Sequence, residues 1–142
     1  AASVSIVEAA GVAGAFSGGW ASDRWSRRGA LAIAFAIAPL ALFGFLAVKG
    51  WPMYLLLAAA GFFGVMTQPI IMAIIQERYA AYRATANGVF MAIVFVVGAL
   101  SAVLIGSMGD AWSLQTAFIV SAGIGLLGFP FSIWLTRPAG HE

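Results

Sequence analysis

Ionisable side chains are scarce in this 142-residue sequence, and Glu8 is the one that falls well inside an apolar stretch. A carboxylate can bind a cation or exchange a proton, and inside a membrane such a group normally faces a water-filled cavity. Gln68, at the middle of a later apolar stretch, carries an amide that donates and accepts hydrogen bonds. We therefore expect Glu8 and Gln68 to line a path for protons or for a small molecule. Two plainer interpretations stay open: Glu8 lies at an interface with water, or Gln68 serves only the backbone groups beside Pro69.

The densest group of charges lies in the segment GGWASDRWSRR, residues 18–28. In a short connection between helices, Asp23 can accept from backbone N–H groups at a neighbouring helix N-terminus. The three arginines can pair with acids or with helix C-termini, and Gly18 and Gly19 let the helix end close to its neighbour. Ser26 is a good residue to cap the next helix. The arginines of the segment are Arg24, Arg27 and Arg28. The plainer interpretation is a basic loop with a stray aspartate.

The remaining charges within the chain fall at the ends of apolar stretches, where we expect them to cap helices or to form loop ion pairs. They include Glu77, Arg78, Arg83 and Asp110. The chain has no cysteine and one histidine, His141, and it shows no paired acids or Ser-His-Asp set. We therefore predict no catalytic residue, no metal site, no cofactor and no enzymatic activity.

Composition defines the class of protein that must position these groups. Hydrophobic residues make up 63% of the chain and charged residues 8%, whereas a soluble domain carries about 25% charged residues. Five apolar stretches follow one another, each near the roughly 20 residues that a transmembrane helix needs, and none alternates as a barrel strand does. The net charge of +2 is no signal for nucleic acid. We predict one all-α membrane bundle of five antiparallel transmembrane helices, over residues 1–22, 30–48, 52–77, 85–109 and 112–136.

Basic residues fall mainly in alternate connections. The first and third loops and the C-terminal tail hold six of the seven lysines and arginines. Because short loops with excess Lys and Arg stay in the cytoplasm, we expect these connections to be cytoplasmic. The protein would then lie in the plasma (inner) membrane, with its N-terminus outside the cell and its C-terminus in the cytoplasm.

Two stripes of small residues at a spacing of four predict close contacts between helices, because small side chains let helix backbones approach one another in lipid. The stripes are Ala10, Gly14 and Gly18, and Gly98, Ala102 and Gly106.

Two segments carry a resemblance to a known family. Gly19-x-x-x-Asp23-Arg24-x-Ser26-Arg27-Arg28 resembles the signature loop G-x-x-x-D-R/K-x-G-R-R/K of the major facilitator superfamily, with Ser26 in place of the family's glycine. The stretch QERYAAYRATANGVFMAIVFVVGALSAVLIGSMGDAW is similar to the family's E-x-x-x-x-x-R-x-x-A-x-G loop and the following G-x-x-x-D helix. The matching positions are Glu77, Arg83, Ala86, Gly88, Gly106 and Asp110.

The resemblance implies helices eight to twelve of a twelve-helix secondary transporter, without the seventh helix and the N-terminal half. Its partners would be the lipid bilayer, the missing half, a small organic substrate and H+, with proton-coupled export by alternating access. A weaker likeness points to fosmidomycin-resistance-type efflux permeases. The alternative is a structural or assembly subunit, or a fragment with no transport pathway of its own. An intramembrane enzyme would need paired catalytic groups at depth, which this sequence lacks.

Overall fold

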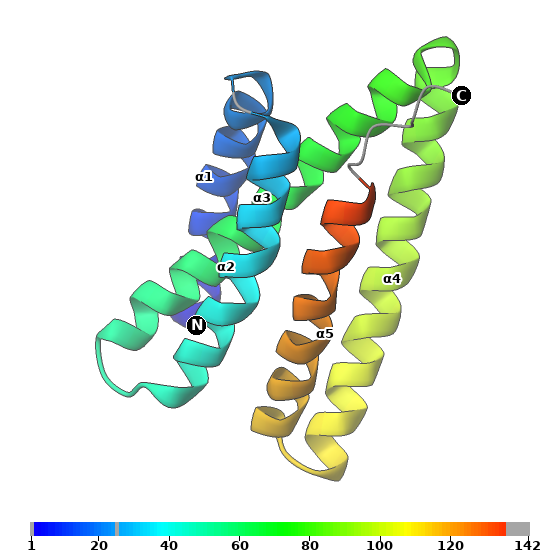
Figure 1. Ribbon diagram of the computed structural model, residues 1–142. Helices are drawn as coiled ribbons and strands as arrows, with labels where there is room; N and C mark the ends of the chain where they lie inside the picture. Colours follow the sequence, from blue (N-terminus) through cyan, green and yellow to red (C-terminus); the bar gives the residue numbers. More distant parts are fainter. Residues whose placement is uncertain (1, 25, 136–142) are drawn as a thin grey trace.

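The computed structural model describes residues 2–24 and 26–135, with side chains for residues 4–21, 24 and 26–130. Every described element is a helix, and successive long helices run in opposite directions (Figure 1). The elements are α1 (Ala2–Arg24), α2 (Arg27–Ala47), α3 (Pro52–Arg78), the short 3-10 helix η1 (Ala80–Tyr82), α4 (Arg83–Ala111) and α5 (Leu114–Leu135). The predicted all-α class of five antiparallel helices is confirmed.

Three helical segments of the described chain are long and apolar enough to cross a membrane: Arg27–Ala47, Pro52–Arg78 and Ala80–Ala111. The apolar part of α5, Leu114–Pro130, is shorter. Helix α1 is not among these segments, since Glu8, four glycines and four serines lower its hydropathy. Length and composition thus mark three of the five expected spans.

Many apolar side chains of α4 are exposed, from Val89 to Leu104, and none of its residues is buried. Phe95 is 74% exposed and Val103 is 68% exposed. Exposing so much apolar surface to water is unfavourable because of the hydrophobic effect. Helix α4 therefore requires an apolar environment, which lipid or further apolar protein provides.

A seam of glycines brings α1 and α3 into close contact. Gly11, Gly14 and Gly18 are buried on α1. A Cβ atom on Gly14 would run into the backbone carbonyl of Phe62, and one on Gly18 would lie 2.7 Å from the carbonyl oxygen of Met66. The predicted contact of the first stripe is found at two of its three positions, with Gly11 in place of Ala10.

The expected close contact of the second stripe is wrong. A Cβ atom on Gly98 or Gly106 would meet no described atom within 4 Å, and Ala102 is exposed. Helix α4 is partly buried at larger side chains such as Phe90 and Met91. Side chains of this size keep helix axes farther apart than glycine does, and Gly98, Ala102 and Gly106 lie on the exposed side of α4.

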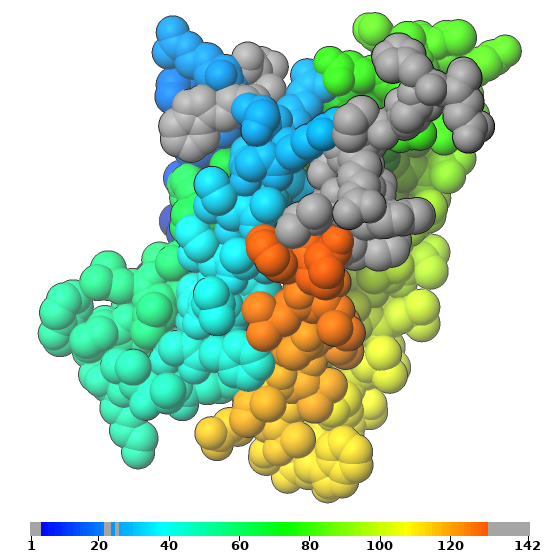
Figure 2. All heavy atoms as spheres, in the orientation of Figure 1, coloured from blue at the N-terminus to red at the C-terminus, as the bar shows by residue number. Residues whose placement is uncertain are grey.

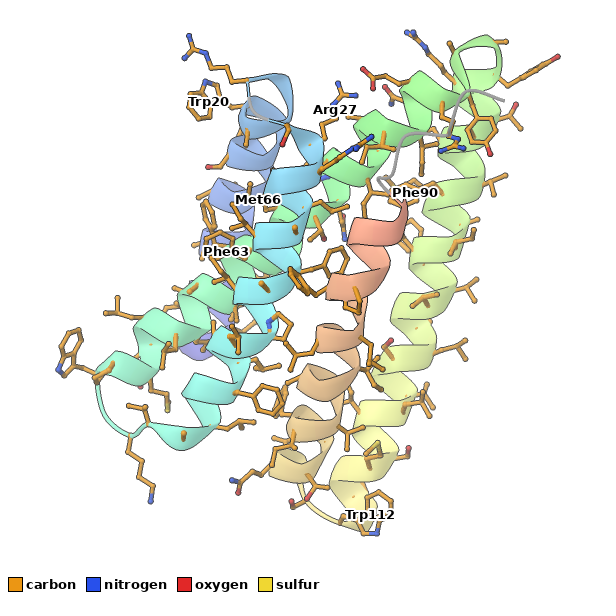
Figure 3. The ribbon with its side chains drawn as sticks, viewed as in Figure 1. Trp20, Arg27, Phe63, Met66, Phe90 and Trp112 are labelled. Atoms are coloured by element: carbon orange, nitrogen blue, oxygen red, sulfur yellow. The ribbon has the colours of Figure 1, made fainter. Side chains whose placement is uncertain are left out.

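The buried core lies near the end of the bundle where α1 ends and α2 begins. It consists of Ala21, Ala30, Leu31, Met66 and Ile70, and Ile70 is fully buried. Figure 3 labels Met66 beside the first turns of α2. This cluster joins α1, α2 and α3 and holds the charged ends of these helices in fixed positions.

The glycine seam predicts that replacing glycine by alanine changes stability differently at Gly14, within the seam, and at Gly106, outside it. Gly14→Ala should lower the stability of the detergent-solubilised protein by about 1–3 kcal/mol, because overpacking forces backbones apart. Gly106→Ala should leave stability unchanged or raise it by up to about 1 kcal/mol, since Ala favours the helix over Gly and the position is open. Thermal unfolding followed by circular dichroism compares the two. Equal effects of the two substitutions would contradict the seam.

Candidate functional site

Glu8 lies in the wall of a pocket of ≈ 630 Å³ between four helices, α1, α2, α3 and α5. Among the described residues that form this wall, Glu8 is the one that carries a charge. The other lining residues are Val4, Val7, Leu42, Phe45, Leu57, Ala60, Gly61, Leu114 and Phe118. We call this space the Glu8 pocket. It lies toward the end of the bundle that holds the α2–α3 and α4–α5 connections (Figure 1).

The helical repeat explains where the carboxylate lies. Val4, Val7 and Glu8 are spaced by three and four residues, so they share one face of α1. Val7 contacts α3, because a Cβ atom on Gly61 would lie 2.7 Å from the carbonyl oxygen of Val7. Glu8 follows about 100° further around the helix, at the margin of the seam, and its side chain is exposed. The carboxylate is thus exposed, and the other residues of the pocket wall are apolar.

Gln68 does not join Glu8 in this pocket. It is exposed on α3, two turns beyond Gly61, which is about 10 Å along the helix. Its neighbour Thr67 donates a hydrogen bond to the carbonyl oxygen of Gly64, 2.7 Å away. The two polar residues that the sequence marks for a pathway therefore lie at different depths and on different helices.

Sequence reasoning did not find a second, smaller space between α2, α3 and α5. This pocket of ≈ 160 Å³ is lined by Pro39, Thr67 and Ser121, among others. The hydroxyl of Ser121 donates to the carbonyl oxygen of Ala117 at 2.8 Å, and that of Thr67 is bonded within α3. Both hydroxyl protons are thus used within their own helices, and the space offers a ligand little polar anchorage.

At the opposite end of the bundle, an ion pair joins the start of α2 to the end of α3. The guanidinium of Arg27 in the first turn of α2 binds the carboxylate of Glu77 near the end of α3. The Arg27 side chain is 24% exposed and that of Glu77 is 67% exposed. The backbone N–H of Gly29 donates to the Ser26 hydroxyl at 3.2 Å, so Ser26 caps α2 as expected. Figure 3 shows Arg27 beside the second half of α3.

Arg24 adds a third contact at this end, with its guanidinium carbon 5.5 Å from the centre of the Trp20 ring. Gly19, one residue before Trp20, is half-buried, and a Cβ atom there would meet no described atom within 4 Å. The side chain of Asp23 lies outside the described residues, as do all of Trp25, Arg137 and His141.

Five described arginines gather at this end of the bundle, and several oppose the helix dipole. Arg27 and Arg28 lie in the first turn of α2, and Arg83 begins α4. Cations at the positive end of a helix are unfavourable, so helix stability does not explain their position. Asp110 lies in the last turn of α4, at the other end.

A comparison with known protein families gives a match. The family described as Major Facilitator Superfamily matches residues 1–142, the full length of the chain. No curated protein and no solved structure matches it. The family description names no subfamily, so the likeness to fosmidomycin-resistance-type permeases stays a prediction.

The ion pair can be tested by exchanging its charges. Arg27→Glu and Glu77→Arg should each destabilise the protein, because each places like charges side by side, and the double substitution should recover part of the loss. An exposed pair contributes about 0.2–1 kcal/mol, so the recovery should be of that size in thermal unfolding. Arg28→Glu, at an exposed neighbouring position, combined with Glu77→Arg is the control and should show no recovery. If the double variant is no more stable than the sum of the two single effects predicts, the contact between Arg27 and Glu77 is not supported.

Proposed function

The chain belongs to the Major Facilitator Superfamily, and we propose on that premise that it exports small organic molecules in exchange for protons. Proteins of this family are membrane transporters of small molecules, so the chain is a transporter or part of one, embedded in a bilayer. The finer statements, on export, on protons and on orientation, are our proposal. The observation that supports proton coupling is the position of Glu8 in the wall of an otherwise apolar pocket between four helices.

A carboxylate in this position suits proton exchange. An ionisable residue within a membrane-spanning helix is by default a candidate for a proton or ion pathway. When the pocket opens to water on one side of the membrane, the carboxylate releases or takes up a proton there. A change of access between the two sides then exchanges protons for the substrate.

We further propose that the arginine-bearing end of the bundle faces the cytoplasm of a cell whose plasma (inner) membrane holds the protein. The Glu8 pocket, at the opposite end, then opens toward the outer side, and the chain begins outside and ends inside. The uneven placement of arginines supports this orientation, because the positive-inside preference favours it. Helix dipoles do not account for Arg27, Arg28 and Arg83, which lie at the positive ends of α2 and α4.

The five helices correspond, in this proposal, to helices eight to twelve of the family, and they work against a second bundle supplied by the rest of the transporter. Alternating access in such proteins is a rocking of one bundle against another around a fixed site. The glycine seam supports the proposal because it makes α1 and α3 one closely packed unit that can move without internal rearrangement. The exposed apolar face of α4 offers a surface for lipid or for that second bundle.

Transport by the full-length gene product tests the proposal. Proteoliposomes that enclose a pH-sensitive dye should show proton movement when a transported compound is added. Glu8→Gln should lower the initial rate at least tenfold, because the amide cannot exchange a proton. Asp110→Asn removes a carboxylate at the same end of the bundle and should retain more than half of the rate. A Glu8→Gln protein that moves protons with substrate as fast as the unmodified protein would refute the role of Glu8.

A further inference from the structure

We propose that a groove between the end of α3 and the start of α4 binds an anionic phospholipid, with the phosphate at two arginines and an acyl chain along α4. The groove has a volume of ≈ 360 Å³ and lies at the arginine-bearing end of the bundle, where η1 joins the two helices (Figure 1). We call it the α3–α4 groove. Its lining residues include Tyr79, Tyr82, Thr85, Val89, Phe90 and Ile93. It shares no described lining residue with the Glu8 pocket, and the inference does not depend on transport.

The helical repeat makes the groove run lengthwise along α4. Thr85, Val89 and Ile93 are spaced by four residues, so they share one face of the helix. From Thr85 to Ile93 the helix rises about 12 Å, from the connection toward the middle of α4. Phe90, which also lines the groove, lies near the start of this helix (Figure 3). A space with this direction suits a hydrocarbon chain that lies parallel to a membrane-spanning helix.

The polarity of the wall changes along the groove. The lining residues that carry hydroxyl groups, Tyr79, Tyr82 and Thr85, all lie at the end next to the connection. Farther along α4 the wall is apolar, and Val89 and Ile93 are each 56% exposed. A small water-soluble anion would gain nothing from this apolar part. A phospholipid has a polar head and an apolar chain, so it matches both parts.

Two arginines border the polar end of the groove and determine the charge of the lipid. Arg78 directly precedes Tyr79, Arg83 directly follows Tyr82, and both arginines are exposed. The nearby carboxylate of Glu77 binds Arg27 of α2, and neither Arg78 nor Arg83 has an ion-pair partner among the described residues. Guanidinium groups bind phosphate oxygens through paired hydrogen bonds. Basic pockets between membrane-spanning helices accordingly bind anionic lipid headgroups.

The connection between the helices keeps these groups together. The backbone N–H of Tyr79 donates to the carbonyl oxygen of Ile75 at 3.0 Å, and that of Tyr82 donates to the carbonyl oxygen of Tyr79 at 2.9 Å. These hydrogen bonds hold both tyrosines in a compact turn, and tyrosine rings favour the headgroup level of a membrane. In the orientation proposed above, this end of the bundle meets the cytoplasmic leaflet, whose surface is negatively charged.

Photo-crosslinking of the full-length gene product in phosphatidylcholine nanodiscs tests the headgroup part. The probe is phosphatidylglycerol with a diazirine in one acyl chain, and peptide mass spectrometry should locate its cross-links in residues 85–93. A phosphatidylcholine probe with the same chain should label this segment at least fivefold less. The double variant Arg78→Gln with Arg83→Gln should lower labelling by phosphatidylglycerol at least fivefold. Arg24→Gln with Arg28→Gln removes the same charge from the same end of the bundle and should change it less than twofold.

A second pair of variants tests the acyl-chain part. Val89→Trp places a large ring in the groove and should lower labelling of residues 85–93 by phosphatidylglycerol at least fivefold. Val103→Trp, at an exposed position of α4 outside the groove, should change it less than twofold. Equal effects of these two substitutions would overturn the site for the acyl chain.

Two further results would overturn the inference. Equal labelling by the two lipids, or equal loss in the two arginine double variants, would exclude an anionic headgroup site. Absence of cross-links in residues 85–93, with cross-links elsewhere in the protein, would show that another part of the transporter covers the groove. Each of these results concerns lipid binding alone and leaves proton exchange at Glu8 to its own test.

Discussion

The close approach of α1 and α3 at Gly14 is the contact on which the rest of the structure depends. In apolar surroundings, helices gain little from burying more apolar surface, so association relies on tight packing of backbones and small side chains. Gly11, Gly14 and Gly18 allow that packing along about two turns of α1, where a Cβ atom on Gly14 would collide with the carbonyl of Phe62. Helix α3 also contacts α2 and α4, which makes it the element through which most of the bundle is joined.

The glycine seam holds α1 and α3 together as a pair, and the two ends of this pair carry different chemical groups. Glu8 lies at its margin, beside an apolar pocket. At the other end, Met66 and Ile70 of α3 form a core with residues of α1 and α2 below the Arg27–Glu77 ion pair. Figure 2 shows α2 and α5 closing over the near face of the bundle. Because the seam resists sliding of α1 along α3, a tilt of this pair would displace the pocket and the arginine-bearing end together.

Much of the fold could be predicted from sequence because composition alone requires it. Long uncharged stretches satisfy their backbone groups within helices where water is absent, and Ser26 has the residue type and position of a helix cap. The contacts between helices were harder to predict. Small residues recur on both α1 and α4, and only the partner decides whether they pack: Gly14 meets α3, whereas Gly106 meets open space. The Glu8 pocket draws on four helices far apart in sequence, and no spacing along the chain indicates that Phe45 and Phe118 line it with Glu8, or that Gln68 does not.

The central claim, that the helices cross a bilayer with the arginine-bearing end inside the cell, is tested most directly by cysteine labelling. The chain has no cysteine, and Ala81 and Ala111, both exposed, lie at opposite ends of the segment Ala80–Ala111. Thirty helical residues span about 45 Å, more than the roughly 30 Å of the hydrocarbon core. With a membrane-impermeant maleimide on intact cells, Ala111→Cys should be labelled and Ala81→Cys should react only after permeabilisation. Labelling of Ala81→Cys in intact cells as fast as Ala111→Cys would contradict the account.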